Sequence, residues 1–161
     1  MTASLEPYLR VSDSPEKIRR ALAQRLAKLP PEISKHIQGL SNHQGSRFSA
    51  SHKAMTVLMN ELKKRKLFYV DSRTTAQTVA DSVAAEQGVA FARRHVFLDN
   101  VAEVPAITVQ LKELTELALQ QGFAIAIGHP YPQTASALAV WIRKQKGILQ
   151  VVPVHHLVNT P

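Results

Sequence analysis

The sequence predicts an α/β fold in which parallel strands alternate with helices within one domain, residues 1–161. Three observations predict it. Segments with the apolar spacing of amphipathic helices alternate with short apolar runs along the whole chain. The connections between these segments are short, as they are where each strand is followed by a helix. Residues 123–127 form a near-continuous apolar run, which is typical of a parallel strand buried on both faces.

The chain opens with residues 1–13, which contain few apolar positions and are expected to form an extended lead-in. A helix should follow, because Ser14 suits the N-cap and Pro15 suits the first helical position. Pro30 and the proline after it stop this helix. Its buried stripe is expected to consist of Ile18, Leu22, Leu26 and Leu29.

The remaining elements follow from the same patterns. Thr74 or Thr75 is expected to cap the third helix of the chain. In order, we expect a strand at 37–42, a helix at 49–66, a strand at 68–70, a helix at 76–87, strands at 89–92 and 96–98, a helix at 106–121, a strand at 123–127, a helix at 134–146 and a strand at 149–154.

The composition excludes several classes of function. The net charge is +8 and the pI about 10.1. We interpret this charge as a solvated basic surface and expect no nucleic acid partner, because no aromatic residues are interleaved with the basic runs. The chain has no cysteine, which excludes disulfides and thiol nucleophiles. No apolar run approaches the length of a membrane span, and the first ten residues contain no apolar core of a signal peptide.

Polar side chains follow the predicted strands at four places, marked by His43, Asp71, Asp99 and His129. The carboxyl ends of parallel strands meet at one rim of a sheet, so these residues are expected to share a site. Two histidines with one or two carboxylates are a plausible ligand set for zinc or another divalent metal. The polar residues beside them serve other roles: Asn42, Ser46 and Ser72 are expected to orient a ligand, and Arg47 or Arg73 to stabilise an oxyanion.

Each of these residues also has a plainer interpretation. A single histidine at a strand end is often a hydrogen-bonded structural residue. Asp71 could cap the next helix with Arg73 as its ion-pair partner, and Asp99 begins an ordinary turn dipeptide. The adjacent pair His155 and His156 is interpreted as structural. The sequence contains neither a glycine-rich phosphate loop nor a G-x-S-x-G nucleophile motif, which argues against nucleotide binding and against a serine hydrolase.

Four motifs in a fixed order carry a resemblance to a known family. They read N-H-Q-G-S-R-F from Asn42, F-Y-V-D-S-R-T-T from Phe68, V-F-L-D-N from Val96 and I-A-I-G-H-P from Ile125. In this order and spacing they resemble the divergent polysaccharide deacetylase family, from about residue 12 to residue 158. One mild departure is Gln44, which stands where the family commonly has methionine.

The resemblance implies a deformed (β/α) barrel and a metal-dependent hydrolase that acts on an acetylated sugar polymer, typically in the periplasm or cell envelope. It implies a divalent metal, zinc, with His43 and His129 as ligands. Asp71, Arg73 and His129 would be the catalytic residues. The substrate-binding residues would be Asn42, Ser46, Arg47, Ser72 and Asp99.

The family begins with a strand that ends in paired aspartates, which supply a catalytic base and a metal ligand. Nothing before Ser12 can supply this pair, and Asp13 lies in a helix-starting context. We therefore expect the chain to match the later two-thirds of a family domain, as a partial barrel that lacks its first strands. Two functions stay open: a deacetylase impaired by truncation, and a non-catalytic relative that binds carbohydrate or another envelope component.

Overall fold

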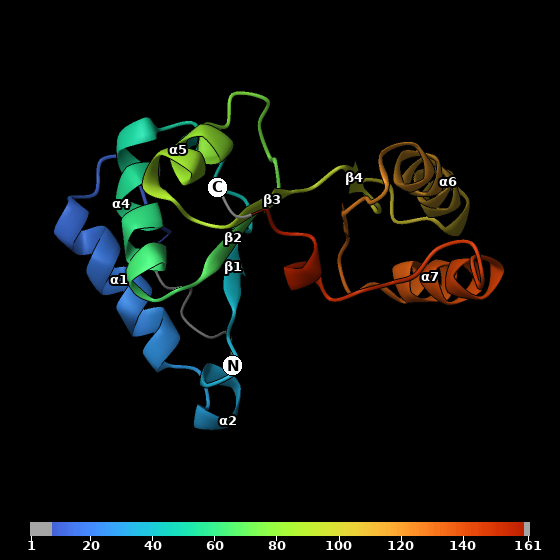
Figure 1. Cartoon of the computed structure of the whole chain (residues 1–161), viewed down its shortest axis with the longest axis horizontal. Helices are drawn as coiled ribbons and strands as arrows, with labels where there is room; N and C mark the ends of the chain where they lie inside the picture. Colours follow the sequence, from blue (N-terminus) through green and yellow to red (C-terminus); the bar gives the residue numbers. More distant parts are fainter. Residues whose placement is uncertain (1–7, 160–161) are drawn as a thin grey trace. The chain divides into compact units, whose positions relative to one another are not determined.

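The computed structural model describes residues 8–159, which form two compact units. Unit 1 comprises residues 8–92 with 158–159, and unit 2 comprises residues 93–157 (Figure 1). Strands alternate with helices in both units, so the predicted α/β class is confirmed. The strands of residues 8–159 form two separate open sheets and no closed barrel. Most of the expected lead-in lies outside the described residues, and residues 11–13 form a turn.

Unit 1 contains a three-stranded sheet in the order β1-β2-β3. Strands β1 and β2 are parallel, with Gly39 paired to Phe68 and Ser41 to Val70. The strand Phe91–Arg93 completes the sheet. The elements are α1 (Pro15–Ala27), α2 (Pro31–Ser34), β1 (Gly39–Ser41), α3 (Ser46–Ser49), α4 (His52–Lys64), β2 (Phe68–Asp71), α5 (Ala80–Gln87) and β3 (Phe91–Arg93).

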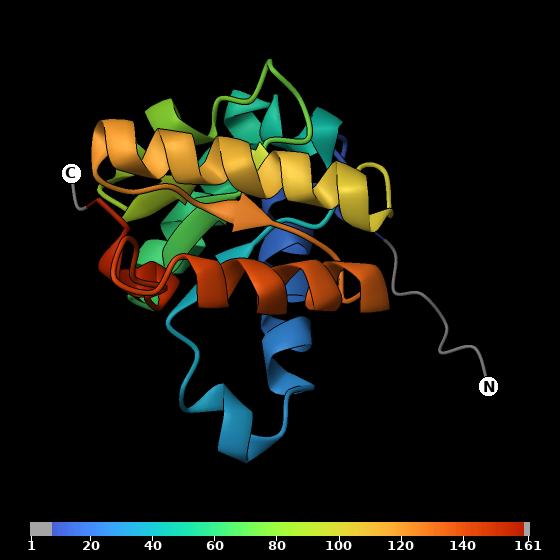
Figure 2. The ribbon, with the colours of Figure 1, turned by 90° about the vertical axis from the view of Figure 1, so that its right-hand side faces the viewer.

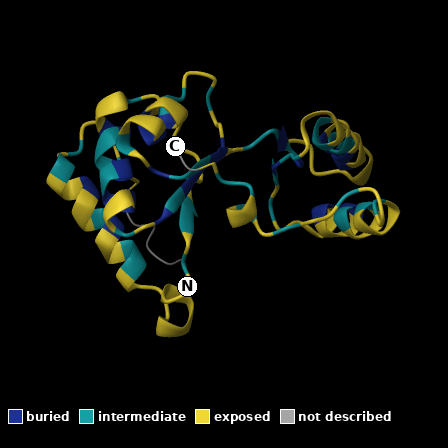
Figure 3. Ribbon diagram, viewed as in Figure 1, coloured by how far each residue is buried: buried dark blue, intermediate teal, exposed yellow. Residues whose placement is uncertain are grey.

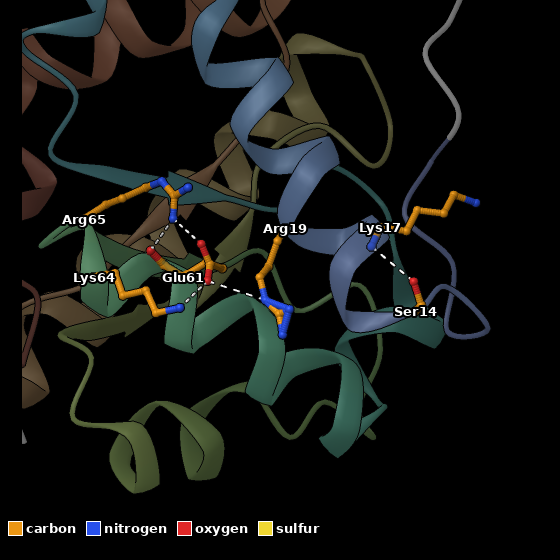
Figure 4. Close-up of polar contacts among 6 residues, drawn as sticks. All are labelled: Ser14, Lys17, Arg19, Glu61, Lys64 and Arg65. Atoms are coloured by element: carbon orange, nitrogen blue, oxygen red, sulfur yellow. Dashed lines mark hydrogen bonds and ion pairs between the residues drawn. The ribbon is translucent and has the colours of Figure 1, made fainter.

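Helix α1 begins as the sequence predicts. The Ser14 hydroxyl accepts a hydrogen bond from the Lys17 backbone N–H at 3.2 Å, with Pro15 in the first turn (Figure 4). Its outer side is largely exposed, whereas Ile18 and Leu22 are buried (Figure 3). These two side chains join the buried apolar residues of α4 in one hydrophobic core that includes Met55, Leu58, Met59 and Leu62.

A buried carboxylate adds polar contacts beside this core. Glu61 of α4 is 5 % exposed. Its carboxylate lies 2.8 Å from Lys64 Nζ, 2.5 Å from Arg65 Nη1 and 3.8 Å from Arg19 Nε of α1 (Figure 4). Hydrogen bonds from Lys64 and then Arg65 lower the pKa of Glu61, and burial opposes them. The group therefore stays ionised and ties α1 to the end of α4.

The prediction of one helix at 49–66 is wrong at its start. Helix α3 ends at Ser49, and α4 starts at His52. Ser51 separates them, because its backbone is extended and its hydroxyl accepts a hydrogen bond from the Ala54 N–H at 3.4 Å. A serine that can cap a new helix therefore ended the first one.

The helix predicted at 76–87 begins four residues later, at Ala80, and neither Thr74 nor Thr75 caps it. Local side-chain bonds hold the chain out of the helix before this point. Thr75 Oγ1 accepts from the Gln77 N–H at 3.2 Å, and Thr78 Oγ1 donates to Asp71 at 2.7 Å.

Unit 2 contains a parallel pair of short strands and two long helices. Strands β4 (Val96–Phe97) and β5 (Ala126–Ile127) pair in register. Helices α6 (Val104–Gln121) and α7 (Pro132–Lys144) run alongside each other (Figure 2). Each begins two residues before its predicted start, because a proline suits the first turn of a helix. Their buried residues, with those of β4, form the core of this unit: Val96, Leu98, Ile107, Leu111, Leu114 and Ala137.

Two strand predictions in unit 2 need correction. Strand β5 is shorter than 123–127, and of these residues only Ile125 is fully buried, the others being half-buried. The strand predicted at 149–154 is wrong: residues 149–153 have no strand partner, and Val154–His156 form a 3₁₀ turn after Pro153. Across residues 8–159, no helix combines the length and apolar character needed to cross a membrane.

Candidate functional site

The most completely bonded polar group in unit 2 lies where its two strands end. Strands β4 and β5 are parallel and in register, so the residues after them arrive at the same edge of the sheet. Asp99 follows β4 and His129 follows β5. The imidazole Nδ1 of His129 lies 2.9 Å from Asp99 Oδ1, and the His129 backbone N–H donates to Asp99 Oδ2 at 2.5 Å. The predicted convergence of these two residues is therefore observed within unit 2.

Helix α7 adds a third donor. The hydroxyl of Thr134, in the first turn of α7, donates to Asp99 Oδ2 at 2.8 Å. Gly128 makes room for this arrangement: a Cβ at that position would lie 3.1 Å from Asp99 Oδ2 and 3.2 Å from Thr134 Cγ2. A larger residue at 128 would therefore press on the carboxylate and on its partner.

The aspartate is buried and ionised, and the histidine reaches solvent. The side chain of Asp99 is fully buried and that of His129 is 35 % exposed. Burial by itself raises the pKa of Asp99. The hydrogen bonds from the His129 backbone, the His129 ring and Thr134 outweigh burial and hold the pKa of Asp99 below its ordinary value. Asp99 is therefore a fixed negative charge behind an accessible imidazole.

Aromatic rings fix the plane of that imidazole. Tyr131 stacks on His129 with ring centroids 5.1 Å apart, and Phe97 approaches it at 5.5 Å. The guanidinium of Arg94 lies over the Phe97 ring at 5.0 Å. The ring is thus held by a carboxylate at Nδ1 and by neighbouring rings.

A carboxylate bonded to Nδ1 of a histidine is a recurring functional arrangement. It fixes the tautomer and the orientation of the ring, and it leaves Nε2 for a different partner. Such a histidine can transfer a proton as a general acid or base, or bind a metal ion. The sequence predicted Asp99 as a substrate-binding residue, whereas its contacts make it the residue that positions His129.

In unit 1, the loop after β1 contacts the loop after β2. Asn42 Oδ1 accepts from the Ser72 backbone N–H at 2.9 Å, and Asn42 Nδ2 donates to the Gln44 carbonyl at 2.9 Å. The hydroxyl of Ser46 donates to the Thr74 carbonyl at 3.1 Å. Asn42 and Ser46, predicted to bind substrate, thus hold the two loops together.

Asp71 shapes the second of these loops. Its side chain is 1 % exposed, Oδ1 accepts from the Arg73 backbone N–H at 2.9 Å, and Oδ2 accepts from Thr78 Oγ1 at 2.7 Å. The plainer interpretation, that Asp71 caps the next helix, is not observed, because α5 has no side-chain cap; Asp71 instead shapes the turn before it. A catalytic role for Asp71 stays a prediction.

The exposed part of this rim carries the cationic and imidazole side chains predicted for it. His43, Arg47 and Arg73 are exposed, whereas Ser72 is buried. Gln44 and Arg73 have positive φ angles, 62° and 47°, which are uncommon for residues other than glycine. Such strained backbone often accompanies a functional loop.

The metal site stays a prediction. The resemblance implies a divalent metal, but no three histidine, aspartate or glutamate side chains within residues 8–159 are grouped closely enough to hold one. His43 lies in unit 1 and His129 in unit 2, where Asp99 already occupies Nδ1. No chemical step is therefore derived through a metal ion.

The fold and this pair define a class of protein: an α/β protein with a carboxylate–imidazole pair at the ends of parallel strands. Residues 4–158 match the divergent polysaccharide deacetylase family, and the chain belongs to that family. The match covers nearly the whole chain and confirms the predicted family.

Three relatives are similar to the chain over most of its length. An "Uncharacterized protein" of Haemophilus influenzae is 40 % identical over 119 residues, 74 % of this chain and 42 % of the relative. "Uncharacterized protein YibQ" of Escherichia coli is 31 % identical over 153 residues, 95 % of this chain and 46 % of the relative. The crystal structure of "uncharacterized protein ATU2773" from Agrobacterium tumefaciens has a TM-score of 0.85 and 25 % identity, covering 91 % of this chain and 58 % of that one. This chain thus spans less than half the length of both curated relatives.

The sequence did not indicate two residues of the pair's surroundings. Thr134 was expected only as the start of a helix, and Gly128 only as part of a motif. A threonine in the first turn of the helix that follows a strand-end histidine was the available signal, because such a hydroxyl lies near the strand ends.

Proposed function

We propose that this chain contributes to the hydrolysis of acetyl groups from an acetylated amino-sugar polymer of the cell envelope. The observation that carries the proposal is the Asp99–His129 pair in a member of the divergent polysaccharide deacetylase family. The envelope and the sugar polymer come from the family resemblance. In the reaction, water adds to the acetyl carbonyl, the bond to the sugar nitrogen or oxygen breaks, and acetate leaves.

His129 supplies the proton transfer in this proposal. Its Nε2 donates a proton to the leaving sugar nitrogen or oxygen, while Asp99 stabilises the charged imidazole that precedes this step. The fixed ring plane and the buried negative charge of Asp99 support this assignment. Thr134 and the His129 backbone N–H keep the carboxylate in place.

The exposed rim of unit 1 suits the binding of a polar polymer. Arg47, Arg73 and His43 offer donors to sugar hydroxyl or carboxylate oxygens. Asn42 and Ser46 hold the loops that carry them. We propose that these residues position the substrate, and that Asp71 acts through the conformation of its loop.

Two finer parts of the proposal rest on the resemblance alone. One is a zinc ion that uses His43 and His129. The other is the correspondence of this chain to the later two-thirds of a family domain.

A non-catalytic role is the second candidate. Two observations favour it: Asp71 has both carboxylate oxygens engaged, and no metal-ligating group of three is present within residues 8–159. In that case the rim of unit 1 binds an acetylated sugar polymer without turnover.

Acetate release separates the two candidates. The chain is incubated with N-acetylchitooligosaccharides and with peptidoglycan fragments, with and without added zinc. Hydrolysis that falls in His129→Ala and persists in His156→Ala supports the first candidate, because His156 lies outside the pair, in the 3₁₀ turn. Sugar binding by calorimetry without acetate release supports the second, and neither binding nor release contradicts both.

A further inference from the structure

Unit 2 contains a cavity of about 800 Å³. This volume lies within the range of about 300–1,000 Å³ that is usual for small-molecule sites. All of its lining residues belong to unit 2. They come from the inner sides of α6 and α7, from the segment that leads into β5, and from residues 148–157.

The wall of this cavity is mostly apolar, with His129, Thr134 and Gln150 as its polar side chains. No lysine, arginine, aspartate or glutamate side chain of residues 93–157 lines it. Leu138 and Trp141 of α7 and Leu149 and Val152 of the final segment line it and are only half-buried by the protein itself. An occupant that removes this surface from water would therefore be stabilised by the hydrophobic effect.

One part of the wall is held rigidly. The indole Nε1 of Trp141 donates a hydrogen bond to Thr115 Oγ1 at 2.9 Å, and the Thr115 hydroxyl donates to the Leu111 carbonyl at 2.9 Å. These bonds fix Trp141 to α6, which satisfies the polar atom of the indole without help from a ligand. The ring therefore presents an apolar, preformed surface to the cavity.

The cavity also reaches the carboxylate–imidazole pair. Gly128, His129 and Thr134 are the lining residues that belong to the pair's surroundings. A ligand in the cavity would thus have an apolar part among the helices and a polar part near His129. This arrangement matches an amphiphile rather than a uniformly polar molecule.

We propose that the cavity binds the acyl chain of an acylated sugar, with the sugar at His129. A sugar ring deep inside the cavity would bury several hydroxyl groups against a mostly apolar wall, which costs free energy for each hydroxyl left unpaired. A hydrocarbon chain has no such groups. The binding of an acyl chain is argued from the cavity alone. The identification of the acylated sugar as a substrate rests on the proposed function.

The single tryptophan of the chain lines the cavity, so its fluorescence reports occupancy directly. The probe is n-octyl β-D-glucoside, titrated below its micelle concentration, with D-glucose as the matched polar control. We expect a saturable change in Trp141 emission with octyl glucoside and none with glucose. Octanoate is expected to compete. A linear response, or equal responses to both sugars, would overturn the proposal.

Cavity-filling variants test the location. Ala118→Phe places a ring in the cavity from α6, whereas Leu119→Phe places one on the exposed side of the same helix, where Leu119 is 60 % exposed. The first is expected to lose the saturable response and the second to keep it. Ala124→Leu fills the cavity from the other side, in case Ala118→Phe does not fold by circular dichroism. Unchanged binding in a folded filled variant contradicts the assignment.

Different results would contradict the proposed hydrolysis and the proposed cavity ligand. If binding occurs but acetate is not released from any acetylated sugar, the proposed hydrolysis is wrong and the cavity assignment stands. If acetate is released but octyl glucoside does not bind, the cavity assignment alone is wrong.

Discussion

Asp99 and His129 are 30 residues apart in sequence, and their side chains meet at 2.9 Å. The contact depends on the parallel register of β4 and β5, which delivers both residues to one edge of the sheet. Through this contact, the buried carboxylate of Asp99 orients the accessible imidazole of His129. Interactions within this one unit therefore fix the most specific chemistry of the molecule.

Replacing the carboxylate of Asp99 by an amide tests how much this charged group contributes to stability. Asp99→Asn keeps the shape. Its carbonyl oxygen can accept from the His129 N–H and from Thr134, as Oδ2 does, while its NH₂ group faces His129 Nδ1 and the negative charge is lost. We expect a loss of about 2–4 kcal/mol in the free energy of unfolding, the usual cost when a buried charged hydrogen-bond partner is removed. Urea unfolding followed by Trp141 emission measures it within unit 2.

Thr134→Val is the control for this prediction. It removes one of the three donors to Asp99 and leaves a charge that is still bonded twice. We expect a smaller loss, about 1–2 kcal/mol. Equal losses in the two variants would show that Asp99 is stabilised mainly through Thr134 and not through His129.

Acid should destabilise the protein through the same carboxylate. The folded-state pKa of Asp99 is lowered, so its contribution to stability is complete above the unfolded value of about 3.9 and is lost as the pH falls through the folded value. We expect the difference in unfolding free energy between wild type and Asp99→Asn to shrink below about pH 4. A difference that grows in acid would contradict the assigned sign.

Much of the fold was predictable because it depends on local patterns. Ser14 with Pro15 marked the start of α1, and the apolar spacing of this helix predicted that Ile18 and Leu22 are buried. The helix starts that were predicted wrongly depend on competing local hydrogen bonds, such as those of the Ser51 and Thr78 hydroxyls. Propensity and periodicity do not rank such bonds against helix formation.

The candidate site was predictable only in part, and for a different reason. The position of His129 after a strand was visible in the sequence, but the role of Asp99 depended on which strands pair and in what register. The strand predicted at 149–154 had the right pattern and found no partner strand. Pairing is a property of distant segments, so a pattern within one segment cannot determine it.

Zinc binding can be tested on the purified chain. The family resemblance predicts stoichiometric zinc that depends on His43 and His129. Metal analysis after dialysis should then show zinc in the wild type and its loss in His43→Ala and in His129→Ala. His36→Ala is the matched control, because His36 is exposed and lies before β1. Absence of zinc in the wild type, or equal zinc in all variants, makes the metal prediction wrong.

Gly39 is required by a close approach between β1 and β2. A Cβ at this position would meet the Phe68 ring, its register partner, far inside van der Waals contact. Gly39→Ala is therefore expected to cost about 1–3 kcal/mol, the range for overpacking. Ser41→Ala, at an exposed position of the same strand, should cost less than about 0.5 kcal/mol. Thermal unfolding followed by far-ultraviolet circular dichroism compares them, and equal melting temperatures would contradict the steric argument.

The carboxylate of Glu61 should stabilise unit 1 more than a surface ion pair does. It is 5 % exposed and is bonded to Lys64 and Arg65, and these bonds lower its pKa. Glu61→Gln keeps the size of the side chain but loses the charge, so we expect a loss of about 1–2 kcal/mol. Glu16→Gln is the matched control, because Glu16 pairs with Arg20 on the exposed side of α1 and should contribute at most about 0.5 kcal/mol. Urea unfolding followed by far-ultraviolet circular dichroism measures both, and equal losses would show that the burial of Glu61 adds nothing to its ion pairs.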